Sequence, residues 1–115
     1  MKEPVVLEKI REAIDKFENS TIYFTTKQMH VHRVSEQQIF AIKIFLALRE
    51  AGIVIVTSHL FMSLYGRSRA GSLQMLHELG DKGILTLVKN KKSGPLRYML
   101  STMFLEYYQH QHQKI

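Results

Sequence analysis

The residues best suited to bind a ligand in this 115-residue chain are basic and hydrogen-bonding side chains between Gly66 and Arg97. Between residues 62 and 100, seven lysines and arginines face two acids, which gives this stretch a net charge of +5 out of +6 for the chain. Positive charge concentrated in one stretch favours a polyanionic partner, although it is also compatible with a solvated surface that only keeps the protein in solution. The placement of the charge, at the start of a helix and in an adjoining turn, favours duplex DNA.

The first group of candidates lies on a helix whose apolar residues Leu73, Leu76 and Leu79 recur at helical spacing. An α-helix fits the major groove of B-DNA, where arginine pairs with guanine and glutamine with adenine. Serine hydroxyls and backbone amides at a helix start are suited to phosphate. Ser68 can cap this helix, but Gly71 and Ser72 could delay its start by a turn. The side chains expected to face DNA are Arg67, Ser68, Arg69, Ser72 and Gln74.

The second group lies in a basic turn between two extended runs, Ile84 to Val88 and Leu96 to Ser101. A helix followed by a strand, a basic turn and a second strand is the order of a recognition helix and its wing. The tip of such a wing can reach the flanking minor groove or the DNA backbone. The residues expected to make these contacts are Lys89, Asn90, Lys91, Lys92, Ser93 and Arg97.

A second helix must support these groups from beneath. Ser35 with Gln38 three residues later is a capping-box pattern, and residues 39–48 are apolar on nearly every side. We expect this helix to be the structural centre, with Gly52 at its end. The run from Ile53 to Val56 predicts a strand. Thr57 or Ser58 can cap a short helix through residue 64, which would complete a helix-turn-helix pair.

Both ends of the chain predict additional helices. Residues 3–18 have an amphipathic pattern, and the β-branched and aromatic residues 21–26 favour an extended segment. A final helix should begin at Ser101 or Thr102. Its apolar side predicts a dimer surface, with packing back onto the first helix as the alternative. The residues expected at the dimer interface are Leu100, Met103, Phe104, Tyr107 and Tyr108.

Enzymatic function is not expected. The chain has no cysteine, no glycine-rich phosphate loop and no zinc-protease motif, and no spacing marks a catalytic triad. We expect no cofactor and no metal, because the pairs His30–His32 and His110–His112 each have no third ligand nearby in the sequence. No apolar run reaches the roughly 18 residues of a membrane span, and no signal segment opens the chain, so a cytoplasmic, nucleoid-associated location is expected.

Three of these segments together resemble the replication terminator protein family of bacilli. They are the capped start Ser35–Gln38, the run Leu76 to Leu85 and the basic wing Lys89 to Gly94. The resemblance covers roughly residues 21–108 and extends more loosely to PadR-type and plasmid-partition winged-helix proteins. It implies a homodimer built through the C-terminal helix, a third helix in the major groove, the wing alongside, and palindromic or repeated sites. The final helix here is shorter than a terminator's, and the N-terminal helix is additional.

These patterns together predict a single α+β, mainly α domain of the winged helix-turn-helix class. It would comprise an N-terminal helix and extended arm (1–34), a winged-helix core (35–101) and a C-terminal dimerisation helix (102–115). A transcriptional regulator, most simply a repressor, is the first expectation. A replication-terminator or plasmid-partition role is the second, and a protein-interaction module without DNA binding is the third. Bound promoter operators would favour the first, and bound sites near a replication terminus or in partition repeats the second.

Overall fold

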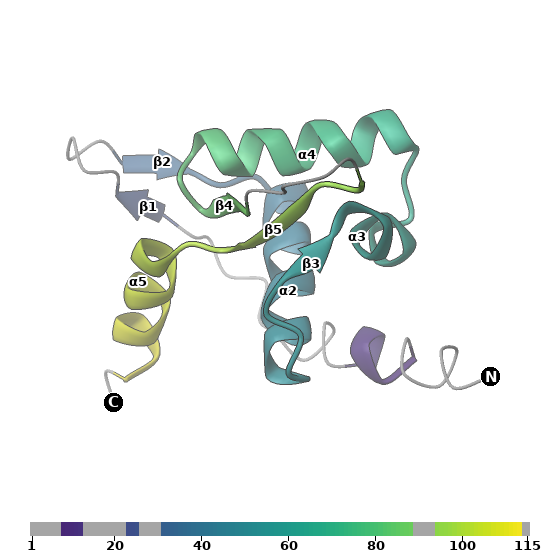
Figure 1. Ribbon diagram of the computed structural model, residues 1–115. Coiled ribbons are helices and arrows are strands. Elements are labelled where there is room, and N and C mark those ends of the chain that lie inside the picture. The colour runs from purple at the N-terminus through teal and green to yellow at the C-terminus, as the bar shows by residue number, and fades with distance from the viewer. Residues whose placement is uncertain (1–7, 13–22, 26–30, 89–93, 114–115) are drawn as a thin grey trace.

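The computed structural model describes residues 8–12, 23–25, 31–88 and 94–113, and side chains are described within 8–12, 34–88 and 94–108. This part of the chain is mainly helical with a small three-stranded antiparallel sheet, which confirms the α+β, mainly α class (Figure 1). A helical segment at residues 8–12 comes first. The later elements are β1 (Tyr23–Thr25), β2 (Val31–Arg33), α2 (Glu36–Glu50), β3 (Val56–Thr57), α3 (Ser58–Tyr65), α4 (Arg69–Asp81), β4 (Leu85–Val88), β5 (Arg97–Leu100) and α5 (Thr102–Gln113).

Helix α2 is the structural centre, as its sequence predicts. The capping box is complete: the Gln38 amide donates to Ser35 Oγ at 3.2 Å, and the Ser35 amide donates to Gln38 Oε1 at 3.0 Å. Every residue from Ala41 to Leu48 is buried. A helix so covered must have neighbours on several sides, and the elements around it form the rest of the core.

The three-stranded sheet has the order β3-β5-β4, with both pairs antiparallel. Strand β3 is shorter than expected, because its pairing with β5 ends at Val56 opposite Tyr98. The prediction that Ile53 to Val56 forms a strand is therefore wrong for its first three residues. The Ile53 amide instead donates to the Leu48 carbonyl at 2.8 Å, which closes the end of α2, and Val54 and Ile55 are exposed.

Helix α4 lies across the N-terminal end of α2 (Figure 1). Two hydrogen bonds join the helices: Gln38 Nε2 donates to Glu78 Oε1 at 3.2 Å, and Lys82 Nζ donates to Gln38 Oε1 at 3.2 Å. The buried residues of α4, Met75, Leu76 and Leu79, belong to the same core. The C-terminal part of α4 is thus fixed to the central helix.

The ends of the chain agree with the sequence where the structure describes them. Residues 8–12 are helical and Ile10 is buried, in keeping with the predicted amphipathic helix, whose remaining residues lie outside the described part. Strands β1 and β2 pair antiparallel in a separate two-stranded sheet. The hydroxyl of Ser101 joins the turn between α4 and β4 to the start of α5, because it donates to the Gly83 carbonyl at 2.7 Å and accepts from the Phe104 amide at 3.0 Å.

Candidate nucleic-acid interface

The turn between α3 and α4 sets where the basic residues stand. Helix α3 is capped by Thr57 and ends at Gly66, whose φ of 72° lies in the left-handed region that a residue with a Cβ adopts only at a cost. Helix α4 then begins at Arg69, with Ser68 as its N-cap: the Gly71 amide donates to Ser68 Oγ at 3.1 Å. The prediction that Ser68 caps this helix is confirmed, and the later start near Gly71 is wrong.

Both arginines at this turn are exposed. The guanidinium carbon of Arg67 lies 5.9 Å from the centre of the Tyr65 ring, within cation–π range. Tyr65 in turn stacks on Phe61 at 4.9 Å and on Phe40 of α2 at 5.9 Å, measured between ring centres. A column of aromatic rings therefore supports Arg67 from the core outward. Sequence reasoning missed this role of Tyr65, although its position two residues before an arginine was visible.

Ser72 does not belong to the exposed group. It is fully buried, on the same side of α4 as Met75, Leu76 and Leu79. Its hydroxyl has no hydrogen-bond partner within the described part of the chain. The prediction that Ser72 faces DNA is wrong, because a helix that begins at Arg69 turns this position towards the core.

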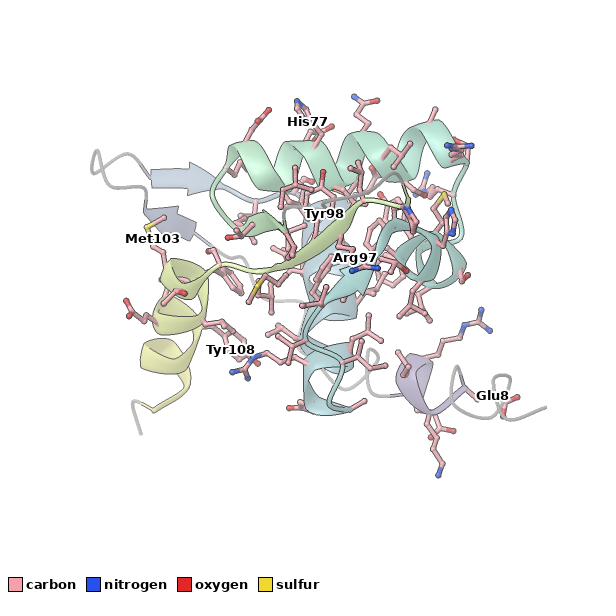
Figure 2. The ribbon with its side chains drawn as sticks, viewed as in Figure 1. Glu8, His77, Arg97, Tyr98, Met103 and Tyr108 are labelled. Atoms are coloured by element: carbon pink, nitrogen blue, oxygen red, sulfur yellow. The ribbon has the colours of Figure 1, made fainter. Side chains whose placement is uncertain are left out.

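Gln74 is exposed as predicted and lies on an exposed stripe of α4 that also contains Ala70, His77 and Asp81, at spacings of four, three and four residues. His77 points away from the body of the molecule (Figure 2), and its Nε2 lies 3.3 Å from Asp81 Oδ2. His77 was missed from sequence, although its spacing of three residues from Gln74 places both on one face. The acid at the far end repels phosphate, so the N-terminal half of α4 is the half suited to DNA.

Arg97 opens strand β5 and is exposed, but it points to the other side of the sheet from its neighbour Tyr98, because side chains alternate along a strand (Figure 2). Tyr98 is buried and faces α4. Burial raises the pKa of the Tyr98 hydroxyl, and the negative charge of Asp81 raises it further. Arg97 is therefore on the outer face of the sheet, separate from the arginines at the start of α4.

The five predicted wing-tip residues, Lys89 to Ser93, lie outside the described part of the chain. The segment that follows them is described and passes beside α3 and α4. The Ser58 amide at the start of α3 donates to the Leu96 carbonyl at 2.8 Å. Gly94, Pro95 and Leu96 line a surface pocket together with Arg69. The structure therefore brings the exit from the basic turn next to the first turn of α4.

The predicted dimer interface is only partly available. Leu100 and Phe104 are buried in the chain's own core, with exposures of 3% and 0%, so the prediction that they form a dimer surface is wrong. Phe104 packs against Tyr107 and Tyr108, with ring centres 6.2 Å and 6.1 Å apart. Burial raises the pKa of Tyr108, and the negative charge of Glu50 raises it further. Met103, Tyr107 and Tyr108 remain partly exposed.

Within the described residues, no group of three or more histidine, aspartate or glutamate side chains could hold a metal ion. None of the described helices is both long and apolar enough to cross a membrane. Comparisons of the chain with protein-family models, curated proteins and solved structures gave no match. The likeness to the terminator family therefore stays a prediction.

Proposed function

We propose that this chain is a winged helix-turn-helix protein that binds double-stranded DNA and acts as a transcriptional regulator, most simply a repressor. The observation that supports it most directly is the start of α4, which is capped by Ser68 and where Arg67, Arg69 and Ala70 are exposed. The order α2, β3, α3, α4, β4, β5 adds support. In this proposal α3 and α4 form the helix-turn-helix pair, and the turn between β4 and β5 forms the wing.

The chemistry of this turn suits an anionic backbone next to base edges. Helix geometry leaves the amides of Arg69 and Ala70 without an intrahelical acceptor, and the positive end of the helix dipole lies there. Such amides bind phosphate. The long side chain of Arg69 and the amide of Gln74 are the types that pair with guanine and adenine in the major groove. His77, one turn further along, extends the same face.

We further propose that the protein acts as a homodimer through the part of α5 that its own core leaves accessible. Met103, Tyr107 and Tyr108 each keep part of their surface exposed. A dimer would carry two copies of α4, the number that palindromic or repeated sites call for. Light scattering at micromolar concentration should give the mass of a dimer, and Tyr107→Asp should give that of a monomer. A monomeric wild-type chain would exclude the dimer and leave DNA binding by single copies to be measured.

The experiment that tests the proposed function is the salt dependence of binding to labelled duplexes, followed by fluorescence anisotropy. If a dimer contacts about six to ten phosphates, log K should fall against log salt with a slope of about −5 to −9. Lys91→Ala with Lys92→Ala should weaken binding to all sequences similarly and make the slope shallower.

The matched control removes two exposed charges elsewhere, Lys9→Ala with Arg49→Ala. Residues 8–12 and the end of α2 lie away from α4 (Figure 1). This variant should keep both the affinity and the slope of the wild type apart from a small effect of net charge. Equal losses in the two double variants would show that charge alone drives binding. No binding at low salt would favour the protein-interaction module.

A further inference from the structure

A pocket of about 410 Å³ lies where α3, the first turn of α4 and the segment entering β5 meet. Pockets for small organic ligands in proteins are typically about 300–1,000 Å³, largely apolar, with a few polar groups that fix orientation. The pocket is therefore large enough for a small organic molecule and larger than one phosphate group requires. Its lining consists of Ser58, His59, Met62, Arg69, Leu73, Gly94, Pro95 and Leu96.

The lining divides into an apolar part and a cationic part. Met62, Leu73 and Leu96 offer hydrocarbon surface, and Leu96 is 43% exposed, which leaves apolar area for a ligand to cover. Arg69 supplies a positive charge, and the imidazole of His59 can donate an N–H. None of the described residues that line the pocket carries a carboxylate to neutralise that charge.

We propose that this pocket binds a small organic carboxylate with an apolar body. A single guanidinium presents a fork that matches one carboxylate with two parallel hydrogen bonds. The apolar body would lie against Met62, Leu73 and Leu96. A phosphate of the DNA backbone would use the cationic part only and leave this apolar surface uncovered.

Binding in this pocket has a consequence that rests on the proposed function. Arg69 lines the pocket and is also the arginine proposed to pair with guanine, so one guanidinium cannot serve both partners at once. The carboxylate should therefore weaken DNA binding, and DNA should weaken carboxylate binding by the same factor. The pocket would then make the protein a regulator that small organic acids release from DNA.

The test uses benzoate as the probe on the full chain without DNA, observed by NMR of ¹³C-labelled methionine methyl groups. Met62 lines the pocket, whereas Met75 is buried in the core and serves as an internal reference. Benzoate should shift Met62 and leave Met75 in place, with a dissociation constant of roughly 1–10 mM for so small a ligand. Benzamide, which has the same shape and no charge, should bind about tenfold more weakly.

Arg69→Gln should weaken benzoate binding by roughly tenfold, the effect of losing a charge-assisted hydrogen bond. Arg49→Gln, which removes the same charge at the end of α2, should leave it unchanged. An unmoved Met75 signal shows that each variant keeps its fold. Equal shifts from benzoate and benzamide, shifts at both methionines alike, or unchanged binding in Arg69→Gln would each overturn the pocket assignment.

A second measurement adds DNA and keeps the two proposals separable. Benzoate at several times its dissociation constant should lower the affinity of the wild type for its preferred duplex and leave that of Arg69→Gln unchanged. If the chain binds benzoate at Met62 but no DNA at all, the proposed function fails and the pocket stands. If the chain binds DNA and benzoate together without mutual weakening, the competition through Arg69 is refuted.

Discussion

Helices α2 and α4 share a serine N-cap and the same closing hydrogen bonds, but they differ in how much of their surface is buried. Each begins at a serine N-cap, Ser35 or Ser68. Each closes with the same pair of backbone hydrogen bonds, Ile53 to Leu48 and Gly52 to Arg49 in one, and Ile84 to Leu79 and Gly83 to Gly80 in the other. Between these ends, α2 is buried on nearly every side, whereas α4 keeps an exposed stripe.

The two helix starts differ at one position. Three residues after its cap, α2 has Gln38, whose side chain returns to the Ser35 amide and also bonds to Glu78 and Lys82. The same position in α4 is Gly71, which has no side chain to return, and a Cβ there would lie 3.2 Å from Ser68 Oγ. The first turn of α2 is thus closed by its own side chains, whereas that of α4 is open to an external acceptor. If the proposed function holds, the same serine cap serves stability in α2 and binding in α4.

The largest change in unfolding free energy should come from a substitution in α2, the buried helix of the two. Phe45 of α2 is 2% exposed and packs against Phe61, with ring centres 5.6 Å apart. Phe45→Ala should cost about 3–5 kcal/mol of unfolding free energy, because it leaves a cavity that the core closes only in part. Gln74→Ala on the exposed stripe of α4 should stay within about 0.5 kcal/mol. Urea unfolding of both variants checks this, and similar costs would contradict the division between the two helices.

Removing each serine cap should show that the two helix starts contribute differently to the unfolding free energy. Ser68→Ala should cost about 1 kcal/mol, the usual effect of losing an N-cap hydroxyl. Ser35→Ala should cost more, up to about 2 kcal/mol, because it also loosens a glutamine that joins α2 to α4. The same urea titrations measure both. A larger loss in Ser68→Ala than in Ser35→Ala would mean that α4, not α2, holds the fold together.

The smallest expected effect on stability comes from Tyr98, which lies where α4 meets the sheet. Because the pKa of Tyr98 is raised in the folded chain, an unfolded chain loses this proton first as the pH rises above about 10. The stabilisation from Tyr98 is therefore complete below that pH and is lost above it. Stability measured from pH 9 to pH 11.5 should fall less steeply in Tyr98→Phe than in the wild type. If the unfolding free energies of the variant and the wild type change with pH in the same way, Tyr98 ionises as readily in the folded chain as in the unfolded one.

Local signals predicted much of this structure and tertiary contacts decided the rest. The caps at Ser35, Thr57 and Ser68 depend on residues within three positions of one another. Sequence spacing was therefore enough to find the cap at Ser35, and it named Thr57 and Ser68 as one of two alternatives each. Whether Ser72 is buried depends on where α4 begins, and the sequence left two starting positions open. The burial of Phe104 depended on where α5 packs, and an apolar stripe alone does not distinguish a partner from the chain's own core.

The most direct test of the central claim compares Arg69→Ala and Gln74→Ala on two duplexes at one fixed salt concentration, after the preferred sequence has been selected from random DNA. With α4 beginning at Arg69, Arg69→Ala should cost about 1–3 kcal/mol per half-site on the preferred duplex and much less on a random one. Gln74→Ala should also reduce the difference in affinity between the preferred and the random duplex. If neither variant reduces this difference in affinity, α4 does not contact base edges, and the assignment of this helix as the recognition helix is wrong.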